Sequence, residues 1–340
     1  MEQKNLETSQ PAHCQHFLDI KDRKLLYYLS EDARSSYTAL AKKLFLSKNA
    51  VKYRITRLQH KGVIKQFSSV LNFATLDKYT FTLLLKFNED IYKRTDIITY
   101  FSKHPRVDWV IVLSGNWDIF AEFVCNNLFE ISHTVDALLS TFHEVLNTYQ
   151  VFLSNDPLRV EHSIDDLYSG LGLPVIRLKP RKIEHYAQDI IDKKILHALC
   201  TDASLHYLAL SKQLGLTLDV VRYRVKLLFA RGVIIKTFAE LSLPKLGYTE
   251  YLYILRLRNV SQEKFSVLKH TITQNKNIEY AFLDKNSFNI IFVCAFQNSE
   301  GIDNLSRGLR RSFSDIIDSQ EYLIVKDQLL FNLFPRGLVD

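Results

Sequence analysis

The sequence predicts an α+β protein of two similar halves, each with three helices, a short β region and a βαββαβ unit. Two observations lead to this prediction. Residues Asp22 to Leu71 recur at Asp192 to Leu241, with a shift of 170 positions and no gap. In each half, the apolar residues first follow a helical period and then alternate between strand-like and helix-like segments. Basic residues recur together with the apolar ones, which indicates a duplicated module that contacts an anion.

Three helices are expected at the start of the first half, in the order helix, helix, turn, helix. Apolar spacing predicts the first over about 19–30, and Ser36 is placed to cap a short second helix. Ser47 is placed to cap the third. The β-prone residues of 63–71 then predict a short wing hairpin. Residues 17–73 are therefore expected to form a winged helix-turn-helix domain.

The rest of the first half predicts a ferredoxin-like βαββαβ domain. Glycine and proline then cluster with basic residues, as is typical of a linker, before the same plan repeats. The predicted fold class is therefore α+β, with two winged helix-turn-helix domains that are each followed by a ferredoxin-like domain. The predicted segments are a disordered N-terminus (1–16), a first winged domain (17–73), a first ferredoxin-like domain (78–156), a linker (157–186), a second winged domain (187–243) and a second ferredoxin-like domain (248–330).

Composition excludes several classes of protein. A chain of 340 residues that is 47% hydrophobic can build two or more cored domains. Its longest apolar run, Ile290 to Phe296, is far shorter than the roughly 18 residues of a membrane span, and Met1 to Gln15 has no apolar stretch like a signal peptide. We therefore expect a soluble, cytoplasmic protein with no membrane partner. The scattered cysteines suit reduced, buried thiols better than disulfides; they are Cys14, Cys125, Cys200 and Cys294.

Positive charge is concentrated around the third predicted helix of each half. The net charge is +7, and the segment from Lys42 to Lys65 has eight Lys or Arg residues and no acid. The matching segment from Lys212 to Lys236 has six basic residues and one acid, Asp219. Such a field favours a polyanion, although a solvated lysine-rich helix face would give a similar count.

The third helix combines an apolar packing face with a polar, basic and aromatic face. Val51, Ile55 and Leu58 share the packing side. The opposite side suits the major groove of double-stranded DNA, where Asn pairs with adenine, Lys or Arg pairs with guanine, and flanking cations meet phosphates. A helix that only packs a bundle would not need these residues to recur. The predicted DNA-binding residues are Lys48, Asn49, Lys52, Tyr53, Arg54, Thr56 and Arg57, and in the second half Arg222, Tyr223, Arg224 and Lys226.

These strings resemble the Lrp/AsnC family of feast-or-famine transcription regulators. The resemblance rests on four segments: Leu18–Leu26, Leu40–Ser47, Val51–Leu58 and Gly62–Lys65. It implies a winged helix-turn-helix domain joined to a ferredoxin-like ligand-sensing domain, here present twice. Several members pair their sensing domains through β-sheet faces, so the resemblance implies self-association, as a pseudo-dimer within one chain or as a homodimer. A tandem fusion departs from the usual single-unit chain.

The resemblance also implies an effector site at a turn between two strands of the sensing domain. In the first half this turn is Gly115, Asn116, Trp117 and Asp118. Glycine lets a ligand approach the backbone and a carboxylate can pair with an ammonium group, so an amino-acid effector is expected there. An ordinary hairpin is the alternative. The matching stretch Lys285 to Asn289 has neither Gly nor Asp at these positions.

Two other functions are the alternatives. Siroheme decarboxylases also fuse two Lrp-like halves, but their His-Asn-Tyr and Asn-x-Trp-Phe motifs are replaced by Val107–Val110 and Ile278–Ala281, so no enzyme and no catalytic residue is predicted. An interaction scaffold without DNA binding would have no need for the basic helix face. The cluster of His13, Cys14 and His16 offers only three ligands, and we predict neither a metal site nor a cofactor.

Overall fold

The structure is a computed structural model and describes residues 18–91, 94–154, 156–161, 164–175, 184–258, 260–284 and 286–339. The first half contains α1 (Ile20–Glu31), α2 (Tyr37–Leu44), α3 (Lys48–His60), β1 (Ile64–Leu71), η2 (Phe73–Leu76), β2 (Tyr79–Phe87), α4 (Thr95–Lys103), β3 (Val107–Ser114), β4 (Ile119–Cys125), α5 (Leu128–Phe142), β5 (Leu146–Leu153), β6 (Asp156–Val160) and η4 (Asp165–Tyr168). The second half contains α6 (Ile190–Thr201), α7 (Tyr207–Leu214), α8 (Leu218–Ala230), β7 (Ile234–Leu241), η5 (Pro244–Leu246), β8 (Thr249–Leu257), α9 (Gln262–Gln274), β9 (Ile278–Asp284), β10 (Asn289–Phe296), α10 (Ser299–Phe313), β11 (Ile317–Phe331) and η6 (Arg336–Leu338).

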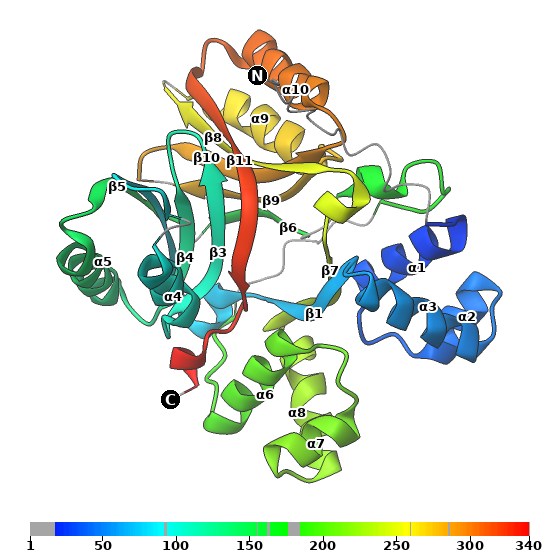
Figure 1. Cartoon of the computed structure of the whole chain (residues 1–340). Coiled ribbons are helices and arrows are strands. Elements are labelled where there is room, and N and C mark those ends of the chain that lie inside the picture. The colour runs from blue at the N-terminus through cyan, green and yellow to red at the C-terminus, as the bar shows by residue number, and fades with distance from the viewer. Residues whose placement is uncertain are drawn as a thin grey trace, which may run out of the picture.

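These elements confirm the predicted α+β fold class, and Figure 1 shows how the halves are arranged. The expectations for residues 1–16, including the cluster of His13, Cys14 and His16, lie outside the described residues. No helix in the described ranges is long and apolar enough to cross a membrane. Among the described cysteines, Cys125, Cys200 and Cys294 are buried free thiols.

The predicted wing hairpin at 63–71 is wrong. Those residues form one strand, β1, and its partner is β7 of the other half, with Phe67 opposite Ala239. The run from 63 to 71 is long enough for one strand and has no tight turn, and its backbone groups are paired by the same segment of the second copy. We call this antiparallel pair the ribbon (β1 and β7). In Figure 1 the ribbon lies between the helices α1 to α3 and the helices α6 to α8.

The ribbon makes the two winged domains depend on each other. The chain after α1 contacts β7, because Ala33 N donates to Thr237 O at 3.2 Å. The chain after α6 contacts β1 in the same way, because Ala203 N donates to Phe67 O at 2.9 Å. The hydroxyl of Ser68 on β1 also donates to a carbonyl of α6. Each group of three helices therefore packs on the strand that the other half supplies.

The remaining strands form a nine-stranded sheet in the order β5-β2-β4-β3-β11-β8-β10-β9-β6. Each half contributes the strand order of a ferredoxin-like domain, and the halves join where β11 pairs with β3. The sheet is folded so that its inner faces meet. Trp109 of β3 packs edge-to-face on Tyr280 of β9, with ring centroids 5.2 Å apart. The two ferredoxin-like domains therefore associate within one chain, and association between chains stays a prediction.

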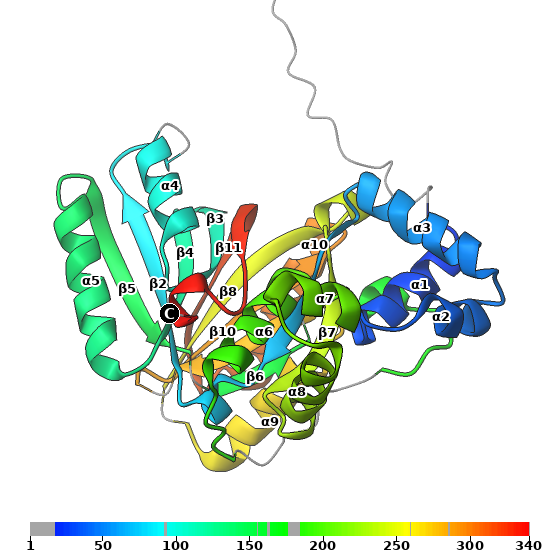
Figure 2. The same ribbon diagram turned by 90° about the horizontal axis from the view of Figure 1, so that it is seen from below.

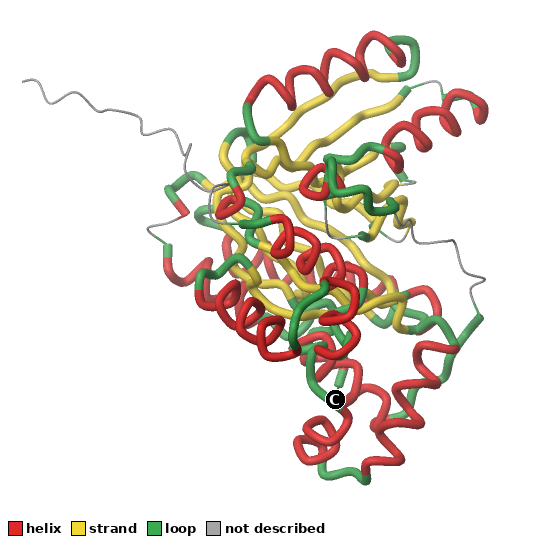
Figure 3. The backbone as a smooth tube through the Cα atoms, turned by 90° about the vertical axis from the view of Figure 1, so that its right-hand side faces the viewer, coloured by secondary structure: helices red, strands yellow, loops and turns green. Residues whose placement is uncertain are grey.

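Helices cover the outer faces of this folded sheet. Apolar residues of α4 and α5 pack on the first half of the sheet, and those of α9 and α10 pack on the second. Figure 3 shows the strands running through the middle of the molecule with helices outside them. In Figure 2, α4 and α5 lie at one end of the molecule and α1 to α3 at the other.

The halves differ where the last strand of each ferredoxin-like domain crosses to the other half. In the second half, β11 is continuous and pairs with β8 and then with β3. In the first half the same course is divided into β5, which pairs with β2, and β6, which pairs with β9. Pro157 follows this break and cannot donate a ladder hydrogen bond. The segment 157–186, predicted as a linker, therefore contributes a strand to the sheet.

Candidate nucleic-acid interface

The recognition helix α3 is fixed by its cap and its apolar face. The hydroxyl of Ser47 accepts a hydrogen bond from Ala50 N at 3.1 Å and so satisfies one of the unpaired amides of the first turn. Val51, Ile55 and Leu58 are buried against α1 and α2, at the spacing that the sequence predicts. This packing determines which side of α3 faces outward.

The outward face of α3 consists of exposed side chains. Its members are Lys48, Asn49, Lys52, Tyr53 and Thr56. Tyr53 is 67% exposed although it is a large aromatic residue, so α3 presents an aromatic surface between its lysines. Exposed cations can meet phosphates, and the Asn side chain can read an adenine edge. All five residues were predicted to bind DNA, and the structure brings them together on one surface.

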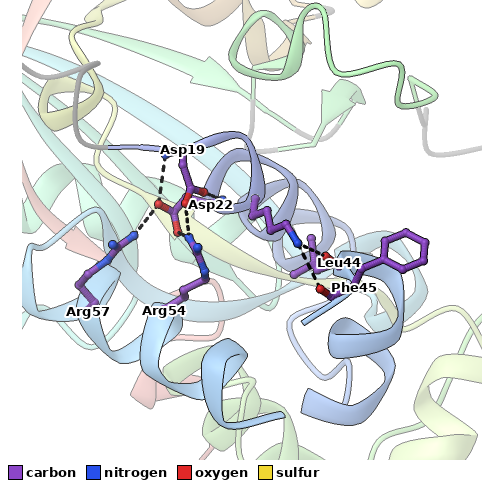
Figure 4. Close-up of polar contacts among 7 residues, drawn as sticks. Asp19, Asp22, Leu44, Phe45, Arg54 and Arg57 are labelled. Carbon is purple, nitrogen blue, oxygen red and sulfur yellow. Dashed lines mark hydrogen bonds and ion pairs between the residues drawn. The ribbon is translucent and has the colours of Figure 1, made fainter. Parts of the chain in front are cut away.

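Arg54 and Arg57 do not belong to this outward face, and their side chains point toward Asp22 at the start of α1 (Figure 4). Arg54 Nη1 lies 2.6 Å from Asp22 Oδ1, and Arg57 Nη2 lies 2.5 Å from Asp22 Oδ2. The Asp22 side chain is only 1% exposed. It belongs to the capping box of α1 and accepts a hydrogen bond from Asp19 N. The two arginines therefore attach α3 to the start of α1, a structural role that the predicted phosphate contacts did not include.

The second recognition helix, α8, has the same construction with a weaker charge. Arg224 pairs with Asp189 and Asp192, as Arg54 does with its own partners. The outward side chains of α8 include Arg222, Tyr223 and Lys226, and Tyr223 is 65% exposed. However, Arg222 pairs with the exposed Asp219 at 3.2 Å.

The sequence analysis did not single out Phe45, an exposed aromatic residue in the turn between α2 and α3. Its side chain is 89% exposed and its φ is 53°, in the left-handed region that few residues except glycine adopt. Lys21 Nζ donates to the carbonyls of Leu44 and Phe45 at 3.0 and 3.1 Å and holds this turn against α1. The repeat indicates the left-handed backbone at this position, because the residue of the second copy that aligns with Phe45 is Gly215, with a φ of 66°.

The predicted effector turn lies between β3 and β4, against β11. The Asp118 carboxylate accepts from Lys86 Nζ and from Phe87 N, both at 2.8 Å. Asn116 Nδ2 donates to Glu321 Oε1 at 2.6 Å. A Cβ on Gly115 would lie 2.6 Å from a methyl carbon of Leu323, so the close approach that requires glycine is to β11. The side chain of Trp117 packs, partly buried, on the core between the halves. In the second half, Lys285 lies outside the described residues.

Both winged domains resemble known DNA-binding domains. A winged helix-turn-helix DNA-binding family matches residues 18–65, and the AsnC-type helix-turn-helix domain matches residues 189–228. An uncharacterised HTH-type transcriptional regulator of Pyrococcus furiosus is 32% identical over 120 residues, which are 35% of this chain and 80% of that protein. The HTH-type transcriptional regulator LysM of Sulfurisphaera tokodaii is 31% identical over 123 residues, which are 36% of this chain and 86% of that protein. The chain belongs to the Lrp/AsnC family. As a member it is a helix-turn-helix DNA-binding transcriptional regulator.

A solved structure resembles the whole tandem arrangement. The siroheme decarboxylase NirDL superposes with a TM-score of 0.61, covering 92% of this chain and 93% of that chain, at 12% sequence identity. At this identity the likeness concerns the fold alone. Within the described residues there is no group of three or more His, Cys, Asp or Glu side chains placed to hold a metal ion.

Proposed function

We propose that this Lrp/AsnC regulator binds double-stranded DNA mainly through the outward face of α3. The observation that carries the proposal is the exposure of Lys48, Asn49, Lys52, Tyr53 and Thr56 on one side of a capped and packed helix. The lysines would meet phosphates and Asn49 a base edge, while Tyr53 would supply apolar contact. Arg54 and Arg57 would act indirectly, by holding α3 against α1.

The outward face of α8 is the second, weaker part of the proposed interface. Asp219 places a carboxylate there and pairs with Arg222, so both the net charge and the number of available cations are smaller. Because the ribbon joins both winged domains within one chain, a single molecule would present two unequal recognition helices. We therefore propose an operator with one strong and one weak half-site.

The test begins with selection of genomic fragments that bind the full chain at a stated salt concentration, since salt governs affinity for DNA. The selected fragment is then used in gel shifts with matched double variants. Lys52→Ala with Tyr53→Ala should weaken binding more than Arg222→Ala with Tyr223→Ala, because only the latter pair has a neighbouring carboxylate. Equal losses would contradict the asymmetry, and no loss in either variant would contradict the proposed surface.

An amino-acid effector at Gly115 to Asp118 is a finer proposal, and the geometry adds a condition to it. The ligand's ammonium group would have to replace Lys86 Nζ on Asp118; the Lys86 side chain is 32% exposed and can move into solvent. A ligand that binds the folded state raises its stability, so a thermal-shift screen of the twenty amino acids should find one that does so. The gain should disappear in Asp118→Ala. If every amino acid fails, or if the gain survives that substitution, the turn is a structural joint.

We propose that the chain does not act as a siroheme decarboxylase. The stretches that replace that enzyme's motif place Asp108 on β3 and Glu279 on β9, and burial raises the pKa of both carboxyl groups. Neither residue offers a cation to a tetrapyrrole carboxylate. Incubation with siroheme should therefore leave its absorbance spectrum unchanged, whereas product absorbance would favour the enzyme.

A further inference from the structure

A cavity of about 290 Å³ lies between the two ferredoxin-like domains and the ribbon. Leu71 of β1, Ile235 of β7 and Leu333 form part of its apolar wall. Its polar lining includes Glu122 of β4. Ala74 and Tyr79 also line it and are exposed, so that end of the cavity faces solvent. The volume is close to the lower end of the range for small-molecule sites, about 300 to 1,000 Å³.

The cavity follows from the difference between the two halves. Ser154 and Pro157, on either side of the break between β5 and β6, line it. At the related place in the other half, β11 is continuous and its Gln328 donates to Glu240 at 2.7 Å. Lys65 Nζ lies 3.3 Å from the same carboxylate. The cavity that these residues line in the other half holds only about 30 Å³. The first cavity is therefore a feature of one side of the duplicated fold.

A buried carboxyl group gives this cavity a specific chemistry. Glu122 is 4% exposed, and its Oε2 accepts a hydrogen bond from the Tyr280 hydroxyl at 3.1 Å. Burial raises the pKa of Glu122 to about 7, although nearby hydroxyls favour its charged form. Ser154 Oγ lies on the same wall, is buried, and makes no hydrogen bond of ordinary geometry within the described ranges. These two buried polar groups lie beside the apolar wall, and the polar side chains of Asn72, Asp77, Lys78 and Thr80 also line the cavity.

We propose that this cavity binds a small organic amine, with its ammonium group on Glu122 and its apolar body against Leu71, Ile235 and Leu333. A carboxylate removed from water is stabilised by a cation that donates hydrogen bonds to it, and apolar walls favour a hydrocarbon body. Ser154 Oγ can accept a second hydrogen bond from the ammonium. Lys78, a cation among the described residues that line the cavity, donates to Asn126 Oδ1 at 2.7 Å. This site is separate from the turn at Gly115 to Asp118 and does not depend on the proposed DNA contacts.

The test uses phenethylamine and its neutral counterpart, 2-phenylethanol, with calorimetry on the full chain. The amine should bind about ten to a hundred times more tightly than the alcohol. This ratio corresponds to the free energy that one hydrogen bond between charged groups usually contributes. Glu122→Gln should reduce amine affinity by a similar factor and leave the alcohol unaffected. Equal affinity for both probes, binding of neither, or unchanged amine affinity in a folded Glu122→Gln protein would overturn the proposal.

A second variant locates the binding without touching the buried carboxyl group. Ala74→Trp adds a large side chain at the exposed end of the cavity, where the substitution should not disturb the core. It should abolish amine binding while circular dichroism and DNA affinity stay at the wild-type level. Amine binding of wild-type strength in Ala74→Trp would place the ligand elsewhere and overturn the proposal. If Glu122→Gln fails to fold, this variant decides the question.

Discussion

Replacing Asp22 by asparagine tests the structural role assigned to the arginines of α3. Asp22 contacts Arg54 at 2.6 Å and Arg57 at 2.5 Å, and it accepts the capping-box hydrogen bond from Asp19 N. The amide keeps the volume but loses the charge. Hydrogen bonds to charged groups contribute about 1.5 to 3 kcal/mol each, and the partly exposed guanidinium groups can regain water. We therefore expect a loss of about 3 kcal/mol in the stability of the α1–α3 domain.

Asp192→Asn is the matched control in the second winged domain. Asp192 is buried to the same extent, but among the described residues a single arginine pairs with it, with Arg224 Nη1 at 3.2 Å. A neutral hydroxyl, that of Tyr186, donates to it at 2.8 Å and can donate equally to an amide. The expected loss is about 2 kcal/mol, so the two variants should differ by about 1 kcal/mol.

Amide hydrogen exchange measures these losses locally, which suits a chain of several domains. In Asp22→Asn, the protected amides of α1 and α3 should exchange about a hundred times faster, and those of α6 and α8 should change much less, because β1 and β7 stay paired. Asp192→Asn should show the reverse pattern with a smaller change. Unchanged exchange in Asp22→Asn, or a larger loss in Asp192→Asn, would refute the assignment of Arg54 and Arg57 to a structural role.

Two further predictions concern Glu122 and the ribbon. Because the folded-state pKa of Glu122 is raised from 4.5 to about 7, its contribution to stability is fully present below about pH 4.5 and is lost as pH rises through 7. The free energy of unfolding should therefore fall as pH rises through about 7, and it should fall less in Glu122→Gln. The same pH dependence in both proteins would contradict this. A fragment of residues 17–73 should lack stable tertiary structure because β1 then has no β7 to pair with. A cooperative melt of that fragment as a monomer would show instead that the winged domain folds alone.

The helices and most strands could be predicted because their signals are local. The cap at Ser47 and the spacing of Val51, Ile55 and Leu58 define α3 without reference to the rest of the chain. The ribbon could not be predicted, because an isolated β-prone segment does not reveal its partner. For the same reason the sequence places β6 in a linker: Pro157 suggests a loop, and only the pairing with β9 makes the segment a strand.

The candidate site was predictable in composition and only partly in geometry. A helical wheel places Arg54 and Arg57 at the flank of the outward face, but it does not show that Asp22, 32 and 35 residues earlier in the chain, is buried beneath them. The ion pairs become visible only when α1 is packed on α3. The cavity at Glu122 was out of reach, since it depends on a break in one strand and on residues from both halves.

The most direct test of the central claim is the salt dependence of DNA affinity for Lys48→Ala with Lys52→Ala. The logarithm of affinity falls linearly with the logarithm of salt concentration, and each lost lysine–phosphate interaction should make this fall less steep by about one. The double variant should therefore reduce the steepness by about two. Lys103→Ala with Lys269→Ala is the control, because it removes the same charge from exposed positions on α4 and α9. That control should keep the salt dependence of DNA affinity seen in the wild type. A wild-type slope for Lys48→Ala with Lys52→Ala, or the same reduced slope for both variants, would contradict the assignment of DNA binding to α3.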